Sequence, residues 1–100
     1  MTAMWEPSDR IVCIHPGWPI LRGHEAVLGS WLRILEGPGR NQFILTNVEV
    51  IVDDHLAWVT LDENLVQGAA TGTVAATNGF ARQADGTWLM FLHHGSPVMG

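Results

Sequence analysis

The alternation of apolar and polar positions predicts one helix followed by a series of strands. Between His24 and Glu36 the apolar residues recur at intervals of three and four, the period of one face of an α-helix. Gly37 and Pro38 end that pattern. The positions beyond Gln42 instead fall into strand-like runs, which are Phe43 to Val52, Leu56 to Val66, Gly72 to Gln83 and Trp88 to Gly95.

A further short strand is expected from about Arg10 to His15. The pair Asp85-Gly86, between the last two runs, is the strongest hairpin signal in the chain. One helix followed by an antiparallel meander is an α+β pattern rather than an alternating α/β pattern. At 100 residues, the chain is expected to form a single domain, residues 1–100.

The last strand lacks the alternation expected of a sheet with one face in water. In "TWLMFLHH" the pattern places Trp88, Met90 and Leu92 on one side, but Leu89 and Phe91 on the other side are apolar as well. A single helix covers only one face of such a sheet. We therefore expect a second copy of the chain to cover the other, as a homodimer through the sheet face.

Composition and charge narrow the classes of partner. Apolar residues make up 47% of the chain and charged residues 15%, which is typical of a globular protein. Five arginines, no lysine and ten acidic residues give a formal net charge of -5, which disfavours nucleic acid and anionic membranes as partners. No membrane span or signal peptide can be drawn, so a cytoplasmic location is expected. The lone Cys13 is interpreted as a small buried apolar residue.

The stretch "CIHPGWP" places the imidazole of His15 where a strand ends and a rigid turn begins. Two interpretations of His15 stay open at this point. It either caps the turn or acts as a general base held on a rigid bend. Trp18, beside the same bend, is expected in the core or in the wall of a pocket.

Polar residues interrupt apolar strand faces at three further places. Glu63 lies on an otherwise apolar side of its strand, and is either a pocket acid or base or a solvated residue near the strand end. Asn78 needs hydrogen-bond partners from a neighbouring strand or from a ligand. The pair His93 and His94 sends one ring to each face of the sheet. No recognised metal spacing is present, and neither a metal nor another cofactor is expected.

Three segments carry a family resemblance. They are "DRIVCIHPGWPILRGHEAVLGSW", "AWVTLDENL" and "AATNGFARQADGTWLMFLHHGSPV". Together they resemble the SnoaL-like branch of the nuclear transport factor 2-like superfamily, from about Ser8 to Val98. The resemblance implies a cystatin-like roll, in which a curved antiparallel sheet wraps on helices to form a cone with a deep apolar pocket. Members usually begin with one or two helices that close the cone, and these are expected to be largely absent here, where only Met1 to Pro7 precede.

The resemblance also implies roles for the candidate residues. In isomerases of this superfamily a general-base aspartate stands directly before a proline, and the matching residue here is His15. Their oxyanion-hole acid aligns on Asn78, whereas their oxyanion-hole tyrosine has no counterpart in a chain without tyrosine. The candidate catalytic residues are therefore His15, Asn78 and His93. The candidate substrate-binding residues are Trp18, Glu63 and His94.

Two functions follow from these candidates. The first is a small-molecule pocket protein that acts as a proton-transfer isomerase, cyclase or lyase on an apolar carbonyl compound. In it, His15 is the base, Asn78 donates to the developing oxyanion, and His93 and Glu63 orient the ring or the substrate. The alternative is a non-catalytic ligand-binding or dimeric association module, in which the same histidines hold turns and an interface together.

Overall fold

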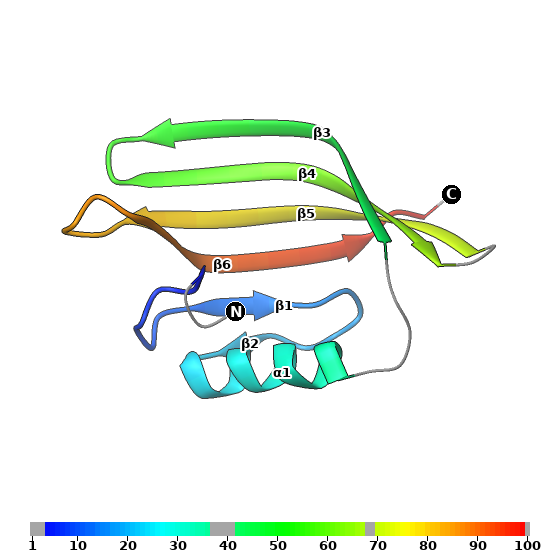
Figure 1. Cartoon of the computed structure of the whole chain (residues 1–100), viewed down its shortest axis with the longest axis horizontal. Helices are drawn as coiled ribbons and strands as arrows, with labels where there is room; N and C mark the ends of the chain where they lie inside the picture. The colour runs from blue at the N-terminus through cyan, green and yellow to red at the C-terminus, as the bar shows by residue number, and fades with distance from the viewer. Residues whose placement is uncertain (1–3, 37–41, 68–69, 100) are drawn as a thin grey trace.

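The computed structural model describes residues 4–36, 42–67 and 70–99. Within these residues the chain forms one α-helix and a six-stranded sheet (Figure 1). The elements are β1 (Val12–Ile14), β2 (Leu21–Arg22), α1 (His24–Glu36), β3 (Gln42–Asp53), β4 (Leu56–Gln67), β5 (Ala70–Arg82) and β6 (Trp88–Pro97). The α+β class is confirmed, and of the described residues before β1 none lies in an α-helix.

The strands are ordered β2-β1-β6-β5-β4-β3. Strands β3 to β6 form an antiparallel meander, and β1 joins it by pairing in parallel with β6. The sheet is curved and unclosed, and α1 lies beside β1 and β2 at one end of it (Figure 1). Side chains of β1 and β6 therefore meet the helix, whereas β3 lies at the far edge.

Helix α1 occupies the residues that the apolar period predicted. Glu25 in its first turn and Arg33 in its last turn interact favourably with the helix dipole. Just before the helix, Gly23 has a positive φ of 88° and its N–H donates to the carbonyl of Ile11 at 3.0 Å. A residue without a side chain adopts this conformation at no steric cost, so Gly23 sets where the helix starts against β1.

A bulge in β6 changes which side chains share a face. Phe80 pairs with Met90, but the adjacent Gly79 pairs with Leu92, so the register shifts by one residue at Phe91. Paired residues in neighbouring strands point to the same face, and consecutive residues of β5 point to opposite faces. The expectation that Met90 and Leu92 share a side is therefore wrong. Met90 faces α1, and Leu92 lies on the outer face, which we define as the face opposite α1.

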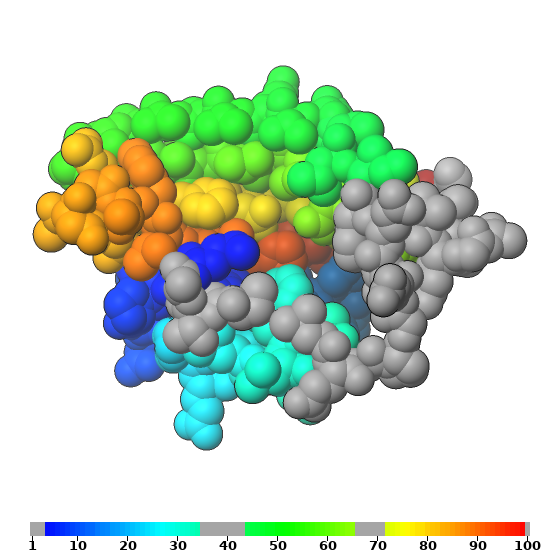
Figure 2. Space-filling view, in the orientation of Figure 1, coloured from blue at the N-terminus to red at the C-terminus, as the bar shows by residue number. Residues whose placement is uncertain are grey.

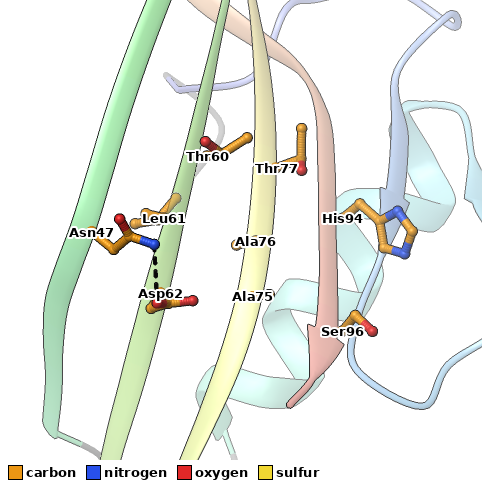
Figure 3. A pocket seen from close by; sticks show the side chains of 9 residues that line it. All are labelled: Asn47, Thr60, Leu61, Asp62, Ala75, Ala76, Thr77, His94 and Ser96. Atoms are coloured by element: carbon orange, nitrogen blue, oxygen red, sulfur yellow. Dashed lines mark hydrogen bonds between the residues drawn. The ribbon is translucent and has the colours of Figure 1, made fainter.

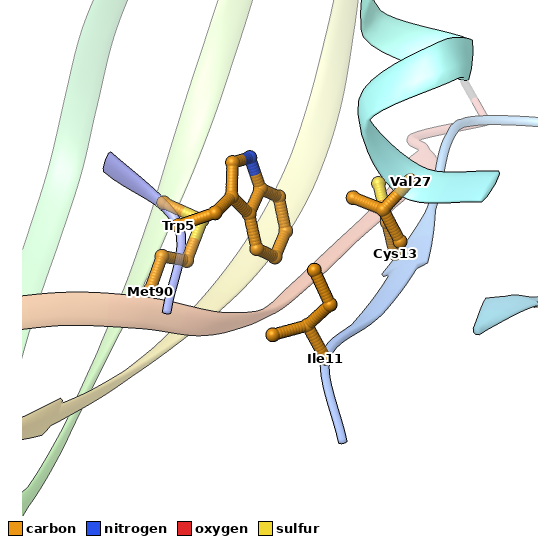
Figure 4. Packing of buried hydrophobic residues seen from close by; sticks show 5 residues of the cluster. All are labelled: Trp5, Ile11, Cys13, Val27 and Met90. Atoms are coloured by element: carbon orange, nitrogen blue, oxygen red, sulfur yellow. The ribbon is translucent and has the colours of Figure 1, made fainter. Parts of the chain in front are cut away.

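The buried apolar cluster lies where the N-terminal segment, β1, α1 and β6 meet. It consists of Trp5, Ile11, Cys13, Val27 and Met90 (Figure 4). The interpretation of Cys13 as a small buried apolar residue is confirmed, since its side chain is free and fully buried.

The N-terminal segment is bound to the sheet although it forms no helix. Trp5 forms a parallel bridge with Met90, and the N–H of Glu6 donates to the Met90 carbonyl at 2.8 Å. The Glu6 carboxylate accepts hydrogen bonds from Arg10 at 2.6 Å, Ser8 at 2.8 Å and Gln83 at 3.2 Å. The hydrogen bond from Arg10 lowers the pKa of Glu6 most strongly, to about 2. One carboxylate thus joins the segment to the end of β5.

Apolar side chains remain exposed on both faces of the sheet far from α1. Figure 2 shows β3 and β4 (green) as a band along one side of the molecule, away from α1 (cyan). On the face toward α1, the exposed apolar residues of β3 include Leu45, Val50 and Val52. On the outer face, those of β3 and β4 include Ile44, Ile51, Leu56 and Trp58.

Candidate functional site

A cavity of about 520 Å³ lies between α1 and the sheet. Most of its wall is apolar and comes from the turn after β1, from α1 and from β3 to β5, through Trp18, Trp31, Ile34, Leu45, Leu65 and Val74. Three titratable side chains, His15, Glu63 and His93, complete the wall. Residues far apart in the chain thus place two imidazoles and one carboxyl group in one apolar space.

His15 follows β1 directly and is only 3% exposed. Its ring lies edge-on between two indoles, with centroid distances of 4.9 Å to Trp18 and 4.7 Å to Trp31. Its Nε2 lies 2.8 Å from Oγ of Ser30 in α1. Burial lowers the pKa of His15, so the ring is neutral at neutral pH.

The backbone of His15 also closes the turn. The N–H of Trp18 donates to the His15 carbonyl at 2.9 Å, and Gly17 between them has a φ of 81°. The backbone of His15 therefore holds the bend, while its ring lines the cavity. The turn-capping interpretation therefore applies to the backbone of His15, and the general-base interpretation of its ring stays a prediction.

His93 projects from β6 on the face toward α1 and is 7% exposed. Its Nδ1 lies 2.5 Å from Oδ1 of Asn78, its register partner in β5. Its ring centroid is 6.1 Å from that of His15. The pKa of His93 is lowered to about 4, mainly because the buried ring loses hydration. The positive charges that His15 and His94 carry when protonated lower it further.

Glu63 lies in β4 opposite Leu45 of β3 and is partly buried in the cavity wall. Burial raises the pKa of its carboxyl group because the charged form loses hydration. The carboxyl group is therefore easier to protonate than a solvated glutamate. A protonated carboxyl group can donate a hydrogen bond to a ligand oxygen. An imidazole nitrogen that carries no proton can only accept one.

The structure places the predicted site residues in two groups. His15, Trp18, Glu63 and His93 line the same cavity, and Asn78 touches that group through the ring of His93. His94 lies apart, on the outer face, in a separate cavity of about 380 Å³ that it shares with Asn47, Thr60, Asp62, Thr77 and Ser96 (Figure 3). Alternation predicted that the two adjacent histidines face opposite ways, and only the structure decides that His93 is the one facing α1.

Ser30 is a site residue that the sequence analysis did not identify. It is fully buried in α1, and its Oγ donates to the carbonyl of Val27 at 2.7 Å besides contacting His15. The only signal in the sequence is a hydroxyl group three residues after Val27, within the apolar stripe of the helix. A serine there gains by hydrogen bonding to the preceding turn, so this signal is weak.

The thiol of Cys13 also lies beside the His15 ring. Its Sγ lies 3.5 Å from Nε2 of His15. Burial raises the pKa of the thiol to about 11, so it stays protonated and neutral. Cys13 therefore packs beside the imidazole without providing a charge.

Two kinds of feature are not found within the described part of the chain. No group of three or more His, Cys, Asp or Glu side chains there is arranged to hold a metal ion. Nor does any helix in those residues have the length and apolar character needed to cross a membrane.

The family follows from a match along the whole sequence. A sequence model of the SnoaL-like domain matches residues 1–100. The chain belongs to the SnoaL-like domain family. Among curated proteins, this SnoaL-like domain is 30% identical to F-box protein SKIP8 of Arabidopsis thaliana, over 99% of this chain and 42% of that protein. It therefore spans less than half the length of that relative.

Solved structures support the same assignment. This SnoaL-like domain is 42% identical to a protein from Streptomyces avermitilis named as a candidate dehydratase of the NTF2-like family. The TM-score is 0.82, and the match covers 90% of this chain and 67% of the other. It is 35% identical to a candidate calcium/calmodulin-dependent protein kinase type II association domain from Thiobacillus denitrificans, with a TM-score of 0.90 and coverage of 99% and 80%. A Nostoc punctiforme protein with a cystatin-like fold, 14% identical with a TM-score of 0.76, shows the fold alone.

Proposed function

We propose that this SnoaL-like domain binds a small apolar carbonyl compound in the cavity and moves a proton on it, as an isomerase, cyclase or lyase. The observation that carries the proposal is that two neutral imidazoles and a carboxyl group with a raised pKa share one apolar cavity. Groups with shifted pKa values that meet in a cavity are characteristic of acid–base catalysis. Proton transfer of this kind needs no cofactor.

The roles divide according to basicity and position. His15 is the base that removes a proton next to the carbonyl group, because His93, with a pKa of about 4, is the weaker base. Glu63 in its protonated form donates a hydrogen bond to the enolate oxygen that develops. Trp18 forms part of the apolar wall that excludes water. Asn78 is not among the residues that line the cavity, so we do not assign it the expected role of oxyanion donor. We propose instead that Asn78 orients the ring of His93 through their hydrogen bond.

Proton exchange tests this function without knowledge of the natural substrate. Cyclohex-2-enone and acetophenone are incubated with the protein in D2O, and loss of their α-proton signals is followed by NMR. The His15→Phe variant keeps an aromatic ring but removes the base, and should lower the exchange rate by about 100-fold or more. The control is His55→Phe, because His55 is exposed in the β3–β4 turn. Full exchange by a folded His15→Phe protein would contradict the role of His15.

A second function, association through the outer face of the sheet, has its own support. Ile51 and Trp58 are register partners on that face, and both are exposed. Exposed apolar patches are typical of protein interfaces. The 35% identity to a candidate association domain adds to this argument. We propose that two copies of the chain pair through this face, leaving the cavity accessible in each, and that the protein works in the cytoplasm.

A further inference from the structure

The two cavity histidines are held through different ring nitrogens. His15 makes its short contact through Nε2, to Ser30, and His93 makes its own through Nδ1, to Asn78. The Cys13 thiol lies farther from both ring nitrogens of His15, at 3.5 Å from Nε2 and 4.0 Å from Nδ1, and is a weak donor. A neutral imidazole carries one proton, so the nitrogen that donates it determines which nitrogen is left as the base. The partners of these two bonds, Ser30 and Asn78, therefore bear on the chemistry of the cavity.

Ser30 leaves one consistent arrangement of protons around His15. Its hydroxyl group has a single proton but lies within hydrogen-bond distance of two atoms, the Val27 carbonyl oxygen at 2.7 Å and Nε2 of His15 at 2.8 Å. The carbonyl can only accept, so the serine proton goes to it. Nε2 must then donate to Oγ, because otherwise two lone pairs would face each other in a fully buried site. His15 is left with an unprotonated Nδ1.

Asn78 leads to the opposite result at His93. Its Oδ1 accepts and does not donate, so Nδ1 of His93 carries the proton. Among the described residues, Nε2 of His93 has no hydrogen-bond partner. The ring is anchored to the sheet through Nδ1 while Nε2 is the unprotonated nitrogen.

We propose that Ser30 and Asn78 are positioning residues that hold the two cavity histidines in opposite neutral tautomers, with the base at Nδ1 of His15 and at Nε2 of His93. Each imidazole then uses its only N–H within the protein. The inference rests on the proposed function for its catalytic meaning, and it deepens that function by naming a ligand class. The histidines accept hydrogen bonds and do not donate them, so the site favours a carbonyl compound that also carries a hydroxyl group or an acidic C–H.

NMR of the protein labelled with 15N-histidine tests the tautomers directly. In long-range 1H–15N spectra at neutral pH, without ligand, the proton should be found on Nε2 of His15 and on Nδ1 of His93. Ser30→Ala should change the tautomer balance of His15 alone, and Ser30→Thr, which retains the hydroxyl group, should restore it. Asn78→Leu should change His93 alone, and Asn78→Asp, which retains an acceptor, should restore it. The signals of His55 serve as the control.

The outcomes separate this inference from the proposed function. A wild-type His15 protonated on Nδ1, or tautomers that stay the same in folded Ser30→Ala and Asn78→Leu proteins, would overturn it whether or not the protein exchanges protons on any ketone. If a variant does not fold, the wild-type spectrum still decides. For the ligand class, phenol and anisole are the matched probes, since only phenol donates. Phenol should bind about tenfold more tightly, and equal binding would refute the ligand class.

Discussion

Burial controls the protonation of the cavity side chains at the scale of single residues. His93 gives the clearest case, because its pKa falls from 6.5 to about 4 through lost hydration and the nearby imidazoles. Protonating it in the folded state would place a charge in an apolar space beside His15. The same apolar surroundings that keep the rings available as bases thus make the fold sensitive to acid.

The unfolding free energy should fall as the pH is lowered from 7 to 5. The unfolded chain binds a proton at His93 below about pH 6.5, and the folded protein does so only near pH 4, so stability increases with pH between these values. His93 alone should account for about 2 kcal/mol between pH 7 and pH 5. Urea unfolding at several pH values measures this, and His93→Gln should reduce the slope. Equal slopes in the two proteins would rule out His93 as the cause.

At the scale of elements, contacts between neighbouring strands contribute to the stability of the sheet. The bulge in β6 brings Phe91 over Gly79 of β5, where a Cβ atom would lie 3.0 Å from Cζ of Phe91 and 3.2 Å from Cβ of Leu92. Gly72, in the same strand, has nothing within 4 Å of such an atom. The two glycines therefore share a strand but differ in the space around them.

Gly79→Ala should destabilise the protein by about 1–3 kcal/mol, because the added methyl group crowds Phe91 and Leu92. Gly72→Ala is the matched control and should be neutral or slightly stabilising, since alanine restricts the unfolded chain. Thermal and urea unfolding of both variants give the comparison. Similar stability of the two would mean that the β5–β6 contact adapts at no cost.

The N-terminal segment is held by the Glu6 carboxylate, so neutralising it should loosen this segment. Glu6→Gln should destabilise by about 1–2 kcal/mol through loss of charge-assisted hydrogen bonds with the partly exposed Arg10. Hydrogen exchange should rise at the Glu6 amide, which donates to Met90. The control is Asp9→Asn, an exposed carboxylate nearby. Unchanged exchange in Glu6→Gln would show that the Trp5 packing alone holds the segment.

At the scale of the whole molecule, the proposed pairing of two copies depends on the outer face of the sheet. Helix α1 lies on the other face of the sheet and covers only the end formed by β1 and β6. Within the described chain, nothing covers Ile51 and Trp58 on the outer face. Ile51 is 50% exposed and points outward, while the next residue, Val52, is 61% exposed and points toward the helix side. Two neighbouring residues thus report on the two faces separately.

The protein should have twice its 11.0 kDa chain mass in light scattering at micromolar concentration. Ile51→Asp should convert it to a monomer, because a charge would be buried between the two copies. Val52→Asp should leave the dimer intact and controls for the cost of aspartate in an edge strand. A monomeric wild type, or equal effects of the two substitutions, would refute pairing through the outer face.

Local patterns predicted the elements that local contacts stabilise. The helix from His24 to Glu36 and the hairpin at Asp85-Gly86 depend on residues within a few positions of one another. The opposite orientation of His93 and His94 likewise follows from the two-residue period of a strand. Such features were available from the sequence because the interactions that form them act over a short stretch of chain.

Tertiary structure alone decided how the segments meet, because those contacts join residues far apart in the chain. The parallel pairing of β1 with β6, the bulge that separates Met90 from Leu92, and the choice of His93 for the cavity have no local signal. The sequence indicated that Asn78 needs hydrogen-bond partners, but its hydrogen bond to His93 depends on the β5–β6 register. Ser30 resembled an ordinary helix serine until α1 packed against β1 and brought its hydroxyl group to His15, a contact across 15 positions that no periodicity encodes.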